Sequence, residues 1–205
     1  VFSFDPVKNI ATPDLGAVAT NDESLATFVR DARYSGIRKT GFQAASQEAE
    51  WWQPDQWMVG PKYAPNDLAA ALALSQLERI EELQAVRELL WDLYVDSLHG
   101  LDGVELPPAI RPGERHSYFT FFIKTAREKR NGLAFFLREC GIYSTVRYSP
   151  LHHQAVFRNA ESNNTSNELP GGDAWAQTVL NLPLHPRLTE GDVEVVVGQV
   201  RKFLT

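Results

Sequence analysis

The sequence lacks a basic excess, a long apolar run and a second cysteine, and each absence excludes a class of protein. Acidic side chains outnumber basic ones, 26 to 20, which gives a formal net charge of -6 at pH 7. A protein that binds nucleic acid through its phosphates needs the opposite balance, so we expect no nucleic-acid partner. No apolar run reaches the roughly 20 residues of a membrane span, so we expect no membrane partner. Cys140 is the one cysteine, which excludes an internal disulfide and predicts a reducing, cytoplasmic location.

An initiator methionine is also missing, because the chain opens with Val1 in an apolar run. Chain termini are usually polar and frayed. We therefore expect this chain to be a fragment of a longer protein. Its 205 residues are enough for one sizeable core or for two small domains.

Two short apolar runs, residues 1–4 and 17–20, are predicted as strands. Asn21 or Asp22 is predicted to cap a helix that follows and ends near Gly36. Between residues 37 and 65, repeated Gly and Pro predict a loop.

Residues 67–98 form the clearest element, since they contain neither Gly nor Pro. Apolar residues recur there at helical spacing and predict one long helix, or two helices with a bend. These apolar residues are Leu77, Ile80, Leu83, Val86, Leu90 and Leu93.

Glycines and prolines between residues 100 and 112 then mark a boundary, which divides the chain into domains of residues 1–98 and 99–205. Strands alternate with helices after it, as in a small α/β unit. The predicted elements are a strand at 116–125, a helix at 128–140 closed by Gly141, a strand at 143–148, a helix around 174–180 and a helix at 189–204 capped by Thr189.

One lysine stands in the polar turn after the first strand. Lys8 follows Asp5 and Pro6 in FSFDPVKN, where the strand would hold its amine in place. An unprotonated amine can attack a carbonyl carbon, and a released amine can move protons as a general acid or base. A plain surface lysine is the alternative, and the residue pattern alone leaves both open.

The adjacent His152 and His153 raise the question of a metal ion. On an extended chain adjacent side chains point in different directions, and the sequence offers no Cys or third ligand at a chelating spacing. We therefore predict no metal site.

Several segments together resemble one known family: FSFDPVKN, GAVATND, GPKYAPNDLAAALALSQLERIEE, HSYFTFFI, RECGIYSTVRYSPLHHQ and LNLPLHPRLTEGDVEVVV. They are collinear from Phe2 to about Leu204 and are similar to the C-terminal half of DegT/DnrJ/EryC1/StrS sugar aminotransferases. The resemblance implies an α/β fold that is part of a fold-type-I pyridoxal phosphate transferase. Residues 1–98 would be the C-terminal part of the large, cofactor-binding domain with the long helix, and residues 99–205 the small α/β C-terminal domain.

The resemblance also implies an activity and a set of site residues. A homodimer would transfer an amino group, with glutamate as the expected donor, to the keto group of a nucleotide-linked sugar. Lys8 would be the catalytic residue, forming a Schiff base with pyridoxal 5'-phosphate, while Ser3 contacts the cofactor phosphate and Asn9 fixes the loop. The implied substrate-binding residues are Arg147, Tyr148 and His152 in the cleft, and Lys62 and Tyr63 across the dimer interface.

Four positions depart from the family pattern, and one of them is Phe119, where many relatives carry histidine. Pro13 and Leu15 replace glycines of a T-x-G-E-G-G loop, where a positive φ would strain either residue. Ala64 replaces an asparagine that in relatives contacts the phosphate of the neighbouring subunit. A truncated, non-catalytic remnant or assembly module of this fold is therefore an alternative function. A second alternative function is that of a sugar dehydratase, which Lys8 disfavours because the dehydratase relatives carry histidine there.

Overall fold

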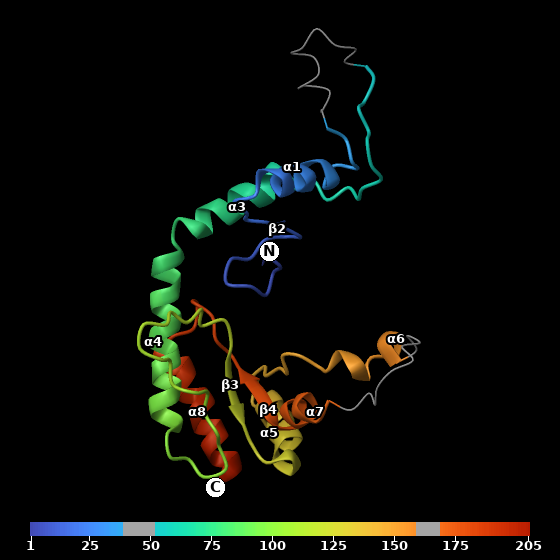
Figure 1. Ribbon diagram of the computed structural model, residues 1–205. Coiled ribbons are helices and arrows are strands. Elements are labelled where there is room, and N and C mark those ends of the chain that lie inside the picture. The colour runs from blue at the N-terminus through green and yellow to red at the C-terminus, as the bar shows by residue number, and fades with distance from the viewer. Residues whose placement is uncertain (39–51, 159–168) are drawn as a thin grey trace. The chain divides into compact units, whose positions relative to one another are not determined.

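The structure, a computed structural model, describes residues 1–38, 52–158 and 169–205 (Figure 1). The chain divides into two compact units, Val1–Ile80 and Glu81–Thr205. In the part of the chain that the structure describes, we find no helix that combines the length and the apolar character needed to cross a membrane.

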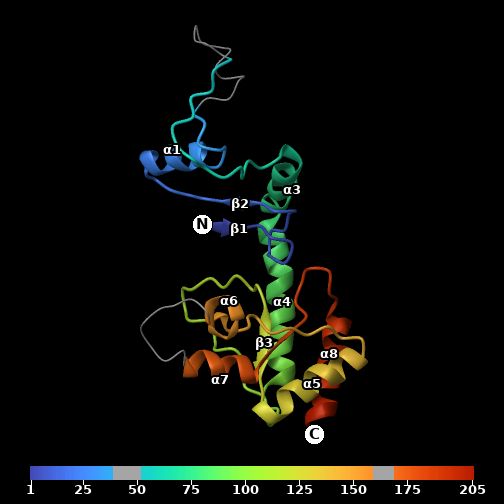
Figure 2. The ribbon, with the colours of Figure 1, turned by 90° about the vertical axis from the view of Figure 1, so that its right-hand side faces the viewer.

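The first unit begins with two short antiparallel strands, β1 (Phe2–Ser3) and β2 (Gly16–Ala17). Phe2 lies opposite Ala17 and Ser3 lies opposite Gly16, and Figure 2 shows the two strands side by side. The unit continues with helices α1 (Glu23–Ala32) and α3 (Asp67–Leu77).

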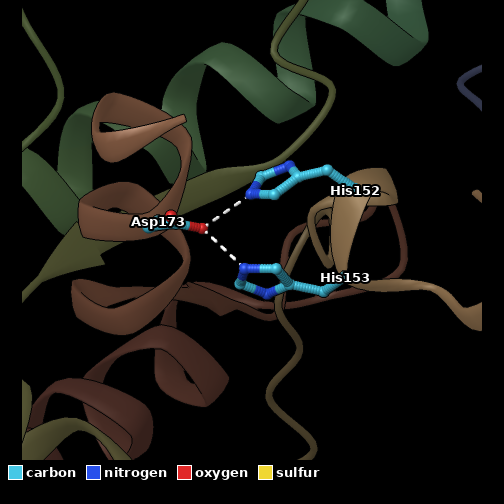
Figure 3. Close-up of side chains that lie close together, drawn as sticks. All are labelled: His152, His153 and Asp173. Atoms are coloured by element: carbon cyan, nitrogen blue, oxygen red, sulfur yellow. Dashed lines mark hydrogen bonds and ion pairs between the residues drawn. The ribbon is translucent and has the colours of Figure 1, made fainter. Parts of the chain in front are cut away.

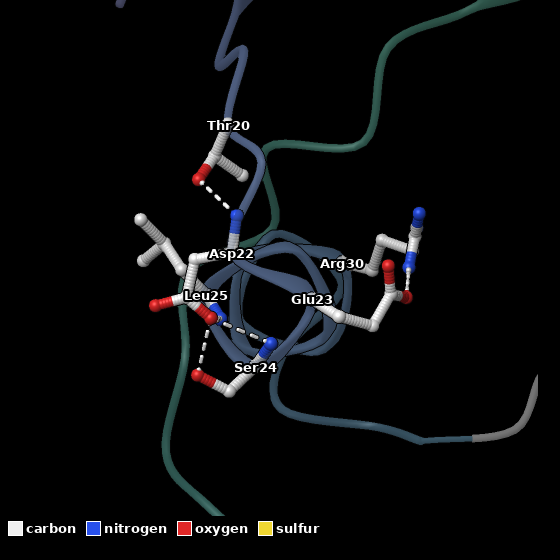
Figure 4. A network of polar contacts seen from close by, with 6 residues as sticks. All are labelled: Thr20, Asp22, Glu23, Ser24, Leu25 and Arg30. Atoms are coloured by element: carbon white, nitrogen blue, oxygen red, sulfur yellow. Dashed lines mark hydrogen bonds and ion pairs between the residues drawn. The ribbon is translucent and has the colours of Figure 1, made fainter.

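Helix α1 starts at the predicted cap, Asp22, whose side chain satisfies the first backbone donors of the helix (Figure 4). Oδ1 of Asp22 accepts hydrogen bonds from the backbone N–H of Ser24 at 2.8 Å and of Leu25 at 3.1 Å. The hydrogen bond from the Ser24 hydroxyl, followed by those from the two backbone groups, lowers the pKa of Asp22. The prediction of this helix start is confirmed.

The long helical segment consists of two helices, the second of the two predicted alternatives. Helix α3 ends at Leu77, a turn at Glu78 and Arg79 follows, and α4 (Ile80–Leu98) begins directly after it.

The second unit is built on an antiparallel strand pair, β3 (Phe121–Lys124) and β4 (Val179–Leu182). Phe121 lies opposite Leu182, and Lys124 opposite Val179. Helix α5 (Arg127–Glu139) packs against β4, α7 (Pro170–Thr178) and α8 (Glu190–Leu204). Figure 1 shows β4, α5 and α7 next to one another. Two short turns of helix, η1 (Leu151–His153) and α6 (Ala155–Arg158), lie between α5 and α7 in the chain.

The core of the second unit includes the buried face of α4: Leu90, Trp91, Tyr94 and Leu98. Tyr94 stacks on Phe121 of β3 with ring centroids 4.6 Å apart. The buried face of α4 therefore belongs to the core of the second unit, although the domain boundary predicted from the sequence lies after this helix, at residue 98.

Some predicted elements differ from the observed ones. The strand predicted at residues 116–125 is shorter, because Tyr118 has a φ of 46° and interrupts the extended run. The strand predicted at residues 143–148 is wrong, since only Thr145 forms a bridge there, with Asn181. The helix predicted around residues 174–180 ends at Thr178, and the apolar residues after it form β4, which was missed.

Two helix ends in this unit are confirmed. Gly141, with a φ of 78°, follows α5 as predicted. Thr189 caps α8, and its hydroxyl and the carboxylate of Asp192 form a reciprocal capping box.

Candidate functional site

Lys8 lies in the turn that follows β1, and its side chain is half-buried. The turn is held by Asp5, whose Oδ1 accepts a hydrogen bond from Val7 N at 3.1 Å and whose backbone oxygen accepts one from Lys8 N at 2.9 Å. The backbone N–H of Asp5 in turn lies 3.4 Å from Ser3 Oγ. Asp5 thus links the two residues, Ser3 and Lys8, that the sequence assigned to the cofactor.

The chain after Lys8 is fixed by helix α3. Gln76 accepts a hydrogen bond from Ala11 N at 3.0 Å and donates one to Ala11 O at 2.9 Å. Thr12 is buried, and its N–H donates to Phe4 O at 2.7 Å. Asn9 lies between these anchors and Lys8, with its side-chain oxygen buried. Hydrogen bonds to the backbone therefore hold the chain at Lys8 itself and at Ala11 and Thr12 after it.

The loop at Pro13 and Leu15 adopts a positive φ at Asp14, with a value of 46°. Asp is among the residues that tolerate the left-handed region best. Leu15 instead uses its backbone oxygen to accept a hydrogen bond from Phe4 N at 2.9 Å. The two substitutions for glycine thus fall on either side of the left-handed residue.

Lys62 and Tyr63 lie in a separate segment of the first unit. Lys62 forms a β-bridge with Tyr34, and its Nζ lies 5.8 Å from the centre of the Tyr34 ring. Tyr63 N donates to Arg33 O at 2.7 Å, while the Tyr63 side chain is exposed. This segment is therefore attached to the end of α1.

Arg147 and Tyr148 belong to the second unit, where Asn181 of β4 positions them. Asn181 is 5% exposed, and its Oδ1 accepts a hydrogen bond from Arg147 N at 2.9 Å. The guanidinium of Arg147 lies 5.6 Å from the Phe119 ring centre and 3.4 Å from the Tyr148 hydroxyl. The structure thus places the half-buried Arg147 beside the exposed Tyr148.

His152 and His153 both point toward one carboxylate, that of Asp173 in the first turn of α7 (Figure 3). The Nε2 atom of each ring lies 2.8 Å from Oδ1 of Asp173. The two rings are 4.3 Å apart, edge to face. His152, a predicted substrate residue, is therefore tied to α7.

With this geometry established, comparison with known proteins identifies the family. The family model described as the DegT/DnrJ/EryC1/StrS aminotransferase family matches residues 1–201. This chain belongs to that family. The resemblance stated from the sequence motifs is confirmed.

Three relatives give the extent of the similarity. The dTDP-4-dehydro-2,3,6-trideoxy-D-glucose 4-aminotransferase of Saccharopolyspora spinosa is 31% identical over 202 residues, which are 98% of this chain and 51% of the relative. The structure of the aminotransferase TlmJ from Streptoalloteichus hindustanus is 30% identical over 90% of this chain and 46% of that one, with a TM-score of 0.77. The structure of S. venezuelae DesV in complex with a ketimine intermediate is 26% identical over 99% of this chain and 50% of that one, with a TM-score of 0.81.

The chain spans about half the length of the curated relatives that it matches. Its mixed α/β architecture is a part of the fold-type-I aminotransferase fold, as predicted. Aminotransferases of this family depend on pyridoxal phosphate.

Two residues around the β1 turn match two groups of that cofactor, its aldehyde and its phosphate. An aldehyde needs an amine, which Lys8 offers, and a phosphate needs a hydrogen-bond donor, which the Ser3 hydroxyl offers. Asp5 contacts the backbone of Lys8 and the side chain of Ser3, so one turn carries both groups.

Sequence reasoning missed three residues that shape these sites: Gln76, Asn181 and Asp173. A signal existed for Asn181, because it is the one polar residue in the apolar run VLNL. Gln76 and Asp173 carry no comparable signal, since each is one polar residue among several in its segment and contacts residues 20 or more positions away in the chain.

Proposed function

We propose that this chain is the C-terminal half of a pyridoxal phosphate-dependent aminotransferase that acts on a nucleotide-linked keto sugar. The observation that carries the proposal is the family match over residues 1–201, with Lys8 in a half-buried, hydrogen-bonded turn. The name of the Saccharopolyspora spinosa relative, an aminotransferase for a dTDP-linked dehydro sugar, supports the substrate class. Glutamate is the expected amino donor.

Lys8 is the proposed catalytic residue. Its amine would hold the cofactor through the aldehyde carbon, with loss of water, and the released amine would take up and return the proton of the sugar carbon. The bound cofactor supplies the electron sink for this proton transfer. Ser3 is proposed to hold the phosphate, and Asn9 to hold the loop that carries Lys8.

Arg147, Tyr148 and His152 are proposed to bind the nucleotide sugar. A guanidinium can hold two oxygens of a diphosphate at once. Backbone anchoring by Asn181 and the neighbouring Phe119 ring restrict Arg147, which lowers the entropy cost of binding.

A homodimer is the proposed assembly, with Lys62 and Tyr63 reaching the substrate of the neighbouring subunit. The surface of the first unit supports the proposal of a partner chain, because the unit exposes many large apolar side chains. They include Phe2, Val7, Val18, Leu68, Leu72, Leu74 and Leu77.

The proposal is tested by mixing the chain with pyridoxal phosphate, reducing with borohydride and locating the modified residue by mass spectrometry. We expect one reduced adduct per chain on Lys8, and none after Lys8→Ala. Lys129→Ala is the matched control, because Lys129 is an exposed lysine on α5 and its loss should leave the adduct intact.

Adduct formation that persists in Lys8→Ala would show that another residue binds the cofactor. No adduct in the unmodified chain, or adducts scattered over surface lysines, would favour the non-catalytic module. Loss of water from a keto sugar nucleotide without an amino donor would favour the dehydratase.

A further inference from the structure

The His152–His153–Asp173 cluster has a geometry that the sequence did not predict. The prediction of no metal site assumed an extended chain, on which adjacent side chains diverge. Here the two histidines lie in the 3-10 turn η1, whose backbone is closed by His153 N donating to Pro150 O at 3.1 Å. Both rings consequently face α7, where Asp173 provides a third ligand, a carboxylate (Figure 3).

We propose that His152, His153 and Asp173 form a binding site for a divalent transition-metal ion of the zinc class. Each residue offers one ligand atom, and these atoms lie within 4.8 Å of one another. With metal–ligand bonds of about 2.0 to 2.2 Å, a tetrahedral ion needs its ligand atoms about 3.3 Å apart. To reach that spacing, each Nε2–Oδ1 distance of 2.8 Å would lengthen by about half an ångström, and the two histidine nitrogens would adjust within their present 4.8 Å limit.

The donor set selects the kind of metal. Two imidazole nitrogens and one carboxylate oxygen suit Zn²⁺, Co²⁺, Ni²⁺ or Cu²⁺, whereas Mg²⁺ and Ca²⁺ prefer oxygen ligands throughout. Three protein ligands leave a fourth position of a tetrahedral ion for water or another ligand.

The cluster is also partly ordered before an ion binds. The side chains of His152 and Asp173 are only 14% and 26% exposed, while that of His153 is 45% exposed. Asp173 is fixed by α7, where its N–H donates to Leu169 O at 2.9 Å. An ion would therefore enter from the side of His153 and displace the two hydrogen bonds to Oδ1.

The inference does not rest on the proposed aminotransferase function, since none of its steps involves the cofactor. It does connect with it at His152, which the proposed function assigns to the nucleotide sugar. The metal test therefore reads ion binding directly and requires no catalytic activity.

The test uses Co²⁺ as a spectroscopic substitute for Zn²⁺, in equilibrium dialysis with visible absorption spectroscopy. We expect one Co²⁺ per chain with the absorption of a low-coordinate ion, and displacement by Zn²⁺. His153→Gln and Asp173→Asn should each weaken binding by at least about tenfold. His185→Gln is the matched control, because His185 is an exposed histidine of the same unit and its loss should leave Co²⁺ binding unchanged.

A ligand replacement guards against variants that simply misfold. His153→Cys keeps a metal-binding atom, so Co²⁺ should still bind and should gain a thiolate charge-transfer band in the near ultraviolet. The proposal is overturned if the unmodified chain binds no Co²⁺ at about millimolar concentration. It is also overturned if His153→Gln and Asp173→Asn bind as the unmodified chain does, if His185→Gln weakens binding equally, or if His153→Cys gains no such band.

Discussion

Individual buried polar side chains fix the geometry of the second unit. Asn181 joins three separate segments, since it accepts a hydrogen bond from Arg147 N at 2.9 Å and donates one to Phe121 O at 3.5 Å from its place on β4. Tyr118, also buried, donates its hydroxyl to Glu88 at 2.7 Å. Leaving a buried polar group without its partner costs more free energy than the hydrogen bond itself contributes to stability.

Replacement of Asn181 by Ala should therefore destabilise the second unit. We expect the free energy of unfolding to fall by about 1 to 3 kcal/mol, because Arg147 N and Phe121 O each lose a buried partner. Chemical denaturation measures the change. Asn131→Ala is the control, since Asn131 is exposed on α5 and its replacement should change stability by no more than about 0.5 kcal/mol.

Tyr118 gives a prediction for alkaline pH. Burial, followed by the hydrogen bond to Glu88, raises the pKa of Tyr118 to about 12. In the unfolded chain tyrosine ionises near pH 10, so between about pH 10 and 12 the unfolded state releases a proton that the folded state keeps. The stabilisation is complete below about pH 10 and is lost as the pH rises, by up to about 1.4 kcal/mol per pH unit.

Tyr118→Phe should remove this contribution to the slope of stability against pH, measured by denaturation at several alkaline pH values. Tyr143→Phe removes an exposed phenol and should leave the slope as it is. Equal slopes in the unmodified chain and Tyr118→Phe would contradict the prediction.

At the scale of elements, the helix ends depend on short-range interactions. The Asp22 cap of α1 and the Thr189 cap of α8 both use side chains next to the helix they start. Such caps satisfy backbone donors that no tertiary contact needs to reach, so they act on each helix separately.

The cap of α1 should therefore respond to acid. Because hydrogen bonds lower the pKa of Asp22 in the folded state, its charged form stabilises the helix above about pH 4, and this contribution is lost as the pH falls through the lower folded value. Asp22→Ala should accelerate hydrogen exchange at the amides of Ser24 and Leu25 several-fold at neutral pH.

Asp22→Asn separates the charge from the hydrogen bond. Asn keeps an acceptor oxygen, so the protection of these two amides, relative to an unstructured peptide, should stay close to that of the unmodified chain at neutral pH. This protection should no longer fall as the pH drops through the range in which Asp22 takes up a proton. Unchanged exchange in Asp22→Ala would contradict the assignment of the cap.

At the scale of the whole molecule, the two units differ in how much they bury. The main hydrophobic core lies in the second unit and combines α4, β3, β4, α5 and α8. The apolar side chains of the first unit that we name above are exposed instead. A chain that spans about half of its relatives is expected to show such a difference, because part of the fold it belongs to lies outside it.

Truncation of one leucine in each unit tests this distribution. Leu90→Ala, in the core, should lower the free energy of unfolding by about 2 to 5 kcal/mol. Leu68→Ala, on the exposed face of α3, should change it by about 0.5 kcal/mol or less. Equal costs in chemical denaturation would mean that Leu68 is covered in solution.

The sequence by itself determined the features that depend on neighbouring residues. It predicted the start of α1, the glycine after α5, the cap of α8 and the position of Lys8 after the first strand, because caps, turns and helical periodicity involve residues a few positions apart. It also identified the family, since the motifs that resemble the family extend over nearly the whole chain.

The tertiary structure decided the features that depend on distant residues. VLNL is a strand rather than the end of a helix because it pairs with residues 121–124. The adjacent histidines converge on Asp173 because a 3-10 turn, and not an extended chain, places them against α7. Short apolar runs and polar clusters fit more than one local conformation, so only long-range pairing selects among them.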